Sequence, residues 1–166
     1  MGDSYGNSES VEHAWAYKAM GEADTHYNII TSVDPDFLTL SEQDDKIYEE
    51  FRSSFPDFDI NMINEDEMKS AEGKKKWRTF CNKFDSMQNF NYGCLVRINP
   101  MEDYNANNCT FATHIQYLAI EIARNREGIT KKLYCKALAE RRARRLAGVT
   151  SMEKLKSMAG EITGAK

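Results

Sequence analysis

The segment QYLAIEIARNREG, residues 116–128, limits the possible folds of this chain more than any other. Its first half is almost continuously apolar apart from one carboxylate, Glu121, and its second half is a dense polar cluster. A carboxylate buried without a partner costs several kcal/mol or takes up a proton. Glu121 therefore needs a partner. The candidates are Arg124 and Asn125, about one helical turn along, and Arg97 in a separate apolar run.

The isoleucines of residues 112–127 would suit a buried strand as well as a helix, but the segment is too long for an average strand. Gly128 is the residue that a helix favours just after its C-terminus. Arg124 and Arg126 lie where cations interact favourably with the last turn. Such a helix would be apolar on most of its circumference, as a central helix is. The sequence therefore favours a central helix here, with a strand as the alternative.

Helical periodicity, with apolar residues three or four apart, recurs along most of the chain. It predicts helices over residues 9–32, about 39–55, from 65 to a break at Gly73, about 74–87, 130–146 up to Gly148, and a further stretch near 151–162. The runs FNYGCLVRINP and CTF favour strands and predict a β-hairpin near residues 92–112. The predicted fold class is α+β, mainly α-helical, with five or six helices and one small antiparallel β-hairpin.

Three regions follow from this pattern. We expect a disordered N-terminus at residues 1–8, a single globular helical domain over 9–130, and a basic helical C-terminal extension over 131–166. No apolar run approaches the ~18–20 residues needed to cross a bilayer, so no membrane contact is expected.

Charge separates an acidic half from a basic tail. Residues 1–70 carry 17 acidic and 4 basic side chains, a net charge of −13, whereas residues 130–166 carry 3 acidic and 10 basic ones, a net charge of +7. The acidic half would attract a basic partner and repel nucleic acid. The helix at 131–146, with four clustered arginines, could bind ribosomal RNA, an acidic partner or the chain's own acidic half.

Sequence motifs of catalysis are absent: there is no G-x-x-x-x-G-K-[ST], G-x-G-x-x-G, H-E-x-x-H or G-x-S-x-G. The histidines His13, His26 and His114 are scattered, and none has a second ligand at zinc spacing. The four cysteines form no C-x-x-C pair, so we expect reduced thiols. We therefore expect no catalytic residue, no cofactor and no metal site.

The polar end of the 116–128 segment allows two interpretations. In the first, Glu121 and its partners form a structural polar lock between the helix and the hairpin. In the second, Arg124, Asn125 and Arg126 form a recognition surface at the end of the helix. Both can hold together, and the residues alone do not choose between them.

Five motifs in a fixed order, VDPDFLTL, DDKIYEEFR, KWRTFCNKF, FNYG and AIEIARNREG, give the chain a specific resemblance. Over roughly residues 9–130 it resembles the small eukaryotic proteins called polysaccharide biosynthesis domain-containing proteins, and residues 131–166 depart from that family. The resemblance implies a small helical domain with a β-hairpin. It also implies a cytosolic chaperone that binds the newly made GTPase domain of translation elongation factor 1-alpha as it leaves the ribosome, and holds it until it folds.

From this resemblance we expect a non-enzymatic, ATP-independent binding protein that is monomeric and cytoplasmic. A nuclear location and contacts with the ribosome or RNA polymerase II are further expectations. The predicted contact surface is the groove between residues 112–127 and the hairpin, edged by Tyr92, Arg97, Arg124, Asn125 and Arg126. Two alternatives remain: an enzyme or enzyme subunit related to polysaccharide biosynthesis, and a transcription- or ribosome-associated adaptor that uses the basic helix at 131–146.

Overall fold

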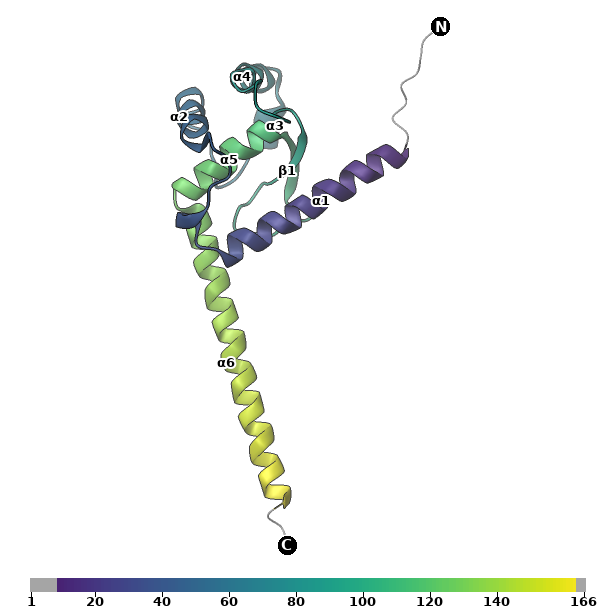
Figure 1. The fold of residues 1–166 in the computed structure, drawn as a ribbon, viewed down its shortest axis with the longest axis vertical. Helices are drawn as coiled ribbons and strands as arrows, with labels where there is room; N and C mark the ends of the chain where they lie inside the picture. Colours follow the sequence, from purple (N-terminus) through teal and green to yellow (C-terminus); the bar gives the residue numbers. More distant parts are fainter. Residues whose placement is uncertain (1–8, 164–166) are drawn as a thin grey trace.

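The computed structural model describes residues 9–163, and the N-terminus predicted to be disordered, residues 1–8, lies outside them. The described residues form six α-helices, one 3₁₀ helix and a two-stranded antiparallel sheet, which confirms the α+β class (Figure 1). In chain order these are α1 (Glu9–Ser32), η1 (Pro35–Phe37), α2 (Asp44–Ser54), α3 (Glu65–Lys69), α4 (Ala71–Asn82), β1 (Gly93–Arg97), β2 (Cys109–Thr113), α5 (His114–Arg126) and α6 (Ile129–Thr163).

Helix α5 lies at the centre of the fold, as its apolar sequence predicts, and the strand alternative is wrong. It begins directly after β2 because Thr113 and Gln116 form a capping box. The Thr113 hydroxyl accepts from the Gln116 N–H at 3.3 Å, and the Gln116 side chain accepts from the Thr113 N–H at 2.8 Å. At the other end Gly128 adopts a φ of 87°, which favours glycine, and α6 starts at the next residue.

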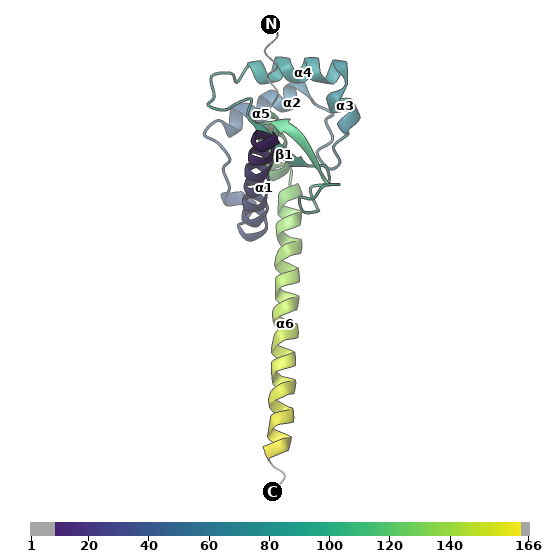
Figure 2. The same ribbon diagram turned by 90° about the vertical axis from the view of Figure 1, so that its right-hand side faces the viewer.

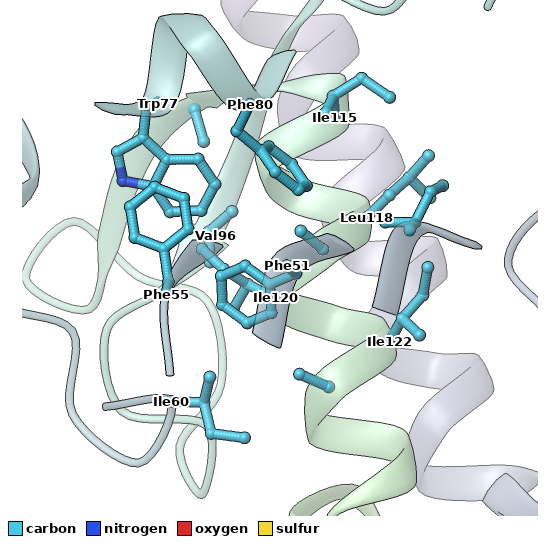
Figure 3. Close-up of a cluster of buried hydrophobic side chains, with 14 of the residues drawn as sticks. Phe51, Phe55, Ile60, Trp77, Phe80, Val96, Ile115, Leu118, Ile120 and Ile122 are labelled. Atoms are coloured by element: carbon cyan, nitrogen blue, oxygen red, sulfur yellow. The ribbon is translucent and has the colours of Figure 1, made fainter. Parts of the chain in front are cut away.

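The hydrophobic core surrounds α5 (Figure 3). Phe51 of α2, Phe80 of α4 and Val96 of β1 are each no more than 1% exposed. Phe55 and Trp77 stack at a centroid distance of 4.2 Å on the α4 side of this core. Because α2, α4 and the hairpin all pack on it, α5 is buried around most of its circumference, with these core residues: Ile115, Leu118, Ala119, Ile120, Ile122 and Ala123.

The hairpin pairs in simple antiparallel register, from Gly93 opposite Thr113 to Arg97 opposite Cys109. Its outer face is partly covered by α1, because the Trp15 ring lies 5.0 Å from the ring of Phe111. A Cβ atom on Gly93 would come within 2.7 Å of the Trp15 ring, so this close packing requires glycine at the start of β1.

The break predicted at Gly73 lies instead at Ser70, which ends α3 and caps α4. The Ser70 hydroxyl accepts from the Gly73 N–H at 3.0 Å. Gly73 itself is in the first turn of α4, where an added Cβ would lie 2.1 Å from the main-chain oxygen of Glu67. The glycine therefore permits the tight corner between the two helices, and it does not end either of them.

Helix α6 continues through Gly148 to Thr163, so the predicted end at Gly148 is wrong. A mid-helix glycine costs only about 1 kcal/mol, which the many Ala, Arg, Lys, Leu and Met residues elsewhere in α6 offset. Figures 1 and 2 show α6 leaving the domain as a single extended helix, and residues 142–161 are all exposed. Within residues 9–163, no helix has both the length and the apolar character to cross a membrane.

Candidate functional site

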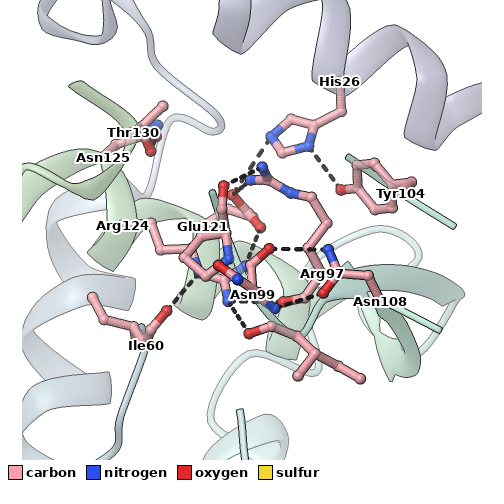
Figure 4. Close-up of polar contacts among 12 residues, drawn as sticks. His26, Ile60, Arg97, Asn99, Tyr104, Asn108, Glu121, Arg124, Asn125 and Thr130 are labelled. Atoms are coloured by element: carbon pink, nitrogen blue, oxygen red, sulfur yellow. Dashed lines mark hydrogen bonds and ion pairs between the residues drawn. The ribbon is translucent and has the colours of Figure 1, made fainter. Parts of the chain in front are cut away.

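Four charged or titratable side chains meet in the interior between α1, β1 and α5 (Figure 4). These side chains, which we call the polar cluster, are His26, Arg97, Glu121 and Arg124. They come from α1, β1 and α5. Arg97 is 1% exposed, Glu121 and Arg124 are 0% exposed, and His26 is 8% exposed. A charge at such depth is tolerated only when it is paired and hydrogen-bonded. The cluster therefore holds three separate elements in a fixed arrangement.

Arg124 makes the largest number of contacts in the polar cluster. Its Nη1 donates to Glu121 Oε1 at 2.9 Å, its Nε to the carbonyl of Ile60 at 3.0 Å, and its Nη2 to the carbonyl of Arg97 at 2.8 Å. A second, longer bond from Nη2 reaches the carbonyl of Ile98 at 3.4 Å. One guanidinium thus joins α5 to the end of β1 and to the loop before α3, using the fixed fork of donors that only arginine offers.

Arg97 completes the pairing of the buried carboxylate. Its Nη2 donates to Glu121 Oε2 at 3.4 Å and its Nη1 to the carbonyl of Pro100 at 2.7 Å. The guanidinium carbon lies 5.4 Å from the ring centroid of Tyr104 and 5.7 Å from that of Tyr27, both at cation–π distance. The hairpin loop is therefore attached to the polar cluster through the same side chain that pairs with Glu121.

The protonation of Glu121 follows from these contacts. Burial raises the pKa of the carboxyl, but the nearby guanidinium groups of Arg97 and Arg124 outweigh it and lower the pKa to about 2. A carboxyl with this pKa is a poor general acid or base near neutral pH. The contacts of Glu121 match the predicted polar lock between helix and hairpin.

His26 is the most weakly paired member of the polar cluster. Its Nδ1 is 2.8 Å from the Tyr104 hydroxyl, while its Nε2 is 3.7 Å from Glu121 Oε2, which is too long for a hydrogen bond. Burial lowers the pKa of His26, and the charges of Arg97 and Arg124 add to this effect, although Glu121 opposes it. The neutral imidazole is therefore favoured in the folded protein.

Two of the residues predicted to edge a contact surface lie in the core. Arg97 and Arg124 are 1% and 0% exposed and do not edge an open surface: their guanidinium groups are used to satisfy Glu121 and main-chain carbonyls. A charge reversal such as Arg124→Glu would therefore destabilise the fold, and a loss of binding in that variant would not identify a contact surface.

The other three predicted edge residues remain at least partly accessible. Tyr92 is half-buried with the Lys18 ammonium 4.7 Å from its ring, and Asn125 is half-buried and accepts from the Thr130 hydroxyl at 2.6 Å. Arg126 is exposed and pairs with Asp45 of α2 at 2.5 Å. These three residues line no common pocket among those found in the described chain.

A small pocket of about 200 Å³ lies beside the polar cluster, between α1, the hairpin and α5. Cys94 and His114 line it, with the thiol sulfur 3.6 Å from Nδ1 of the histidine. Burial raises the pKa of the Cys94 thiol to about 11, so the thiolate needed for nucleophilic attack is scarce at neutral pH. No group of three metal-ligating side chains was found in the described part of the chain.

A larger feature, which the sequence analysis missed, is a groove of about 570 Å³ between α1 and residues 38–40. We call it the α1 groove. Its apolar lining comes from Ile29, Ile30, Leu38 and Leu40, and its polar lining includes Lys18, Glu22 and Thr25. The adjoining Val33 and Phe37 are 39% and 83% exposed. Ile29 lies outside the stripe that α1 buries, and this second apolar position was the signal that could have indicated the groove.

The polar cluster generates a prediction about stability. We expect Arg124→Met to lower the free energy of unfolding by about 3–5 kcal/mol, because it leaves a buried carboxylate underpaired and the carbonyls of Ile60 and Arg97 without the donor that Arg124 supplies. The control Arg126→Met removes an exposed pair on the same helix and should cost less than about 1 kcal/mol. Urea denaturation measures both, and equal losses would contradict the role given to Arg124.

His26 generates a prediction about pH. Because its folded pKa lies below the ordinary 6.5, the unfolded chain binds the proton more readily, and the free energy of unfolding falls as the pH drops below about 6.5. We expect this loss, measured by urea denaturation from about pH 7.5 to about pH 5.5, to be smaller in His26→Gln. His114 is present in both proteins, so its contribution cancels. Identical pH profiles would show that His26 does not carry the effect.

Comparisons with known proteins agree with this fold. The model of a family described as PBDC1 protein matches residues 11–135. Human protein PBDC1 is 48% identical over 80% of this chain, and a PBDC1 homologue of Saccharomyces cerevisiae is 34% identical over 74%. The chain spans 57% of the human relative's length and 88% of the yeast relative's.

A solution NMR structure of the Saccharomyces cerevisiae protein yst0336 superposes on the chain with a TM-score of 0.71 at 32% identity. The alignment covers 81% of this chain and 93% of the yeast one. The sequence match and the structural match thus cover most of the domain. The chain belongs to the PBDC1 family, the polysaccharide biosynthesis domain-containing proteins that its motifs resemble.

Proposed function

We propose that this protein is an ATP-independent chaperone that holds the newly made GTPase domain of translation elongation factor 1-alpha until it folds. The α1 groove is the observation that carries the proposal on the structural side. A protein that holds a partly folded client needs accessible apolar surface with a polar rim. The family resemblance, through the five motifs quoted above, supplies the identity of the client.

The α1 groove has the features that suit such a client. Ile29 is 42% exposed at its edge, and Phe37, which directly precedes the lining residue Leu38 in the chain, is 83% exposed. A ring exposed to this extent contributes little to the stability of the monomer, whereas burial against a partner would remove its apolar area from water. Glu22 at the rim, and the excess of carboxylates in residues 1–70, favour association with a basic client surface.

The mechanism that follows is mass action. Binding of an incompletely folded domain lowers its free concentration, and aggregation slows because it depends on that concentration. Release occurs when folding of the client buries the apolar surface that the groove contacts. This cycle uses the difference in binding free energy between the unfolded and folded client, and it requires no nucleotide.

The proposal is tested with purified proteins. We expect the full chain to suppress aggregation of the refolding elongation factor 1-alpha GTPase domain, and Phe37→Ser with Ile29→Ser to weaken binding about tenfold or more, the range typical of apolar contact residues. Tyr17→Ser is the matched control, since Tyr17 is an 85% exposed aromatic residue of α1 that does not line the groove. Normal binding by the double variant would exclude the groove, and failure of the unaltered chain to bind would refute the chaperone proposal.

An adaptor function through α6 is a second candidate, favoured by the exposure of its arginines. Arg142, Arg144 and Arg145 all face solvent on a helix that leaves the domain (Figure 2). Such a row of cations can contact the phosphates of an RNA helix.

We expect the affinity for an RNA hairpin to fall steeply with salt concentration. When these three arginines become glutamine, the slope of the logarithm of the association constant against the logarithm of the salt concentration should fall in magnitude by about 2–3. Lys74→Gln with Lys75→Gln, on exposed positions of α4, should leave the slope unchanged. Salt-independent or absent RNA binding, measured by fluorescence anisotropy, would dismiss the adaptor.

A further inference from the structure

A second pocket, of about 380 Å³, lies on the α4 side of the molecule, away from the polar cluster. It is formed by the turn after α2, by α3 and by the first turns of α4, and we call it the aromatic pocket. Phe55, Phe58 and Trp77 line it. Trp77 is stacked on Phe55 at 4.2 Å and meets Phe58 edge-on at 5.6 Å. The pocket shares no lining residue with the α1 groove.

Carboxylates surround the aromatic pocket. Asp57, Asp59, Glu67 and Glu72 all line it. Among the described residues, the side chains of Asp57, Glu67 and Glu72 form no ion pair and no hydrogen bond with a basic group, and Asp59 accepts only from the main-chain N–H groups of Asn61 and Met62. Unlike the acidic residues that anchor Lys131, these carboxylates remain available to a cation from outside.

An unpartnered donor also lines the aromatic pocket. Trp77 as a whole is 3% exposed, and none of the hydrogen bonds in the described part of the chain involves its indole N–H, but this nitrogen is not among the fully enclosed polar atoms that lack a partner. Figure 3 shows the nitrogen edge of this ring turned away from Phe80 and Ile120. A buried tryptophan usually finds an acceptor for its N–H. The indole N–H is therefore accessible in a residue that lines the pocket, where an oxygen of a ligand can accept from it.

One cation of the chain itself already uses the rim. The ammonium of Lys76 lies 5.5 Å from the centroid of the Phe55 ring, within cation–π range. Lys76 is exposed, and it lines the pocket as its only basic residue. The aromatic surface and the negative rim thus suit an ammonium or guanidinium group whose apolar stem packs against the rings.

We propose that the aromatic pocket binds a basic peptide segment of another protein. A lysine or arginine side chain would lie between the carboxylates with its stem against Phe55 and Phe58, and a main-chain carbonyl of the segment would accept from the Trp77 N–H. A peptide meets both requirements, a cation and an acceptor, in one ligand. A nucleic acid does not, because the carboxylate rim repels phosphates. The site acts independently of the α1 groove and of any chaperone activity.

The test uses the ¹⁵N-labelled full chain and the acetylated, amidated peptide Gly-Arg-Lys-Gly. The two indole N–H resonances are assigned with Trp15→Phe, since Trp15 lies on the hairpin side against Phe111. We expect the Trp77 resonance to shift saturably during titration while that of Trp15 does not. The same peptide with citrulline and norleucine in place of its basic residues should give no shift.

Variants identify the rim. The double variant Glu67→Gln with Glu72→Gln should lower the affinity for the peptide about tenfold, because two exposed charge interactions are lost together. Asp66→Asn is the matched control, because Asp66 is an exposed acid of α3 that does not line the pocket. Three results would overturn the proposal: no shift of the Trp77 resonance, equal weakening by Asp66→Asn, or the same shift produced by spermidine, which offers cations without a carbonyl.

Discussion

The pairing of Glu121 with Arg97 and Arg124 is the interaction on which the arrangement of this domain depends. Taking a carboxylate and two guanidinium groups out of water is costly, and their attraction only repays this cost when the remaining donors and acceptors are also satisfied. Most of them are. Arg124 satisfies the carbonyls of Ile60 and Arg97, and Arg97 satisfies that of Pro100. The polar cluster therefore gives the fold one specific arrangement, which an apolar contact of equal area would not define.

This geometry determines what the surface can offer. Since α5 is enclosed by α2, α4 and the hairpin, and the polar cluster uses its charged side chains internally, little of α5 is left for a partner. The accessible hollows lie instead where peripheral elements meet: the α1 groove beside residues 38–40, and the aromatic pocket at the α3–α4 corner. The corner depends on Gly73, because no larger residue allows α4 to start so close to the Glu67 carbonyl.

The sequence predicts well those features that depend on a single segment, such as whether it forms a helix and whether its residues are buried. The helix at α5 follows from its length and its capping residues, and the need of Glu121 for arginine partners follows from the cost of burying a charge. That Arg97 and Arg124 are themselves fully buried does not follow from the sequence, for a related reason. Arginine is rarely fully buried, and only the three-dimensional contacts show that these two satisfy a carboxylate and several carbonyls.

The two hollows could not be predicted because their walls come from different elements, whose relative placement the sequence does not give. Ile29 and Leu40 meet across the α1 groove, and Phe55 and Trp77 meet in the aromatic pocket. Periodicity assigns each residue to a face of its own helix, but it does not say which faces remain uncovered. The prediction that a helix ends at Gly148 was wrong for a simpler reason. The low helix propensity of one glycine is a weak constraint inside a long helix rich in good helix formers.

The long helix also decides how the two charged parts of the chain relate. Contacts between the basic tail and the acidic half are made by Lys131, which pairs with Asp34 and Asp36, and by Arg141, which donates to the carbonyl of Thr31. Beyond Arg141 the helix carries its cations away from the domain, as Figures 1 and 2 show, and within the described part of the chain none of them pairs with a carboxylate of residues 11–70. Charges separated by more than a Debye length of about 8–10 Å interact weakly. The negative charge of residues 11–70 and the positive charge of α6 beyond Arg141 therefore remain in separate regions of the molecule and do not cancel each other.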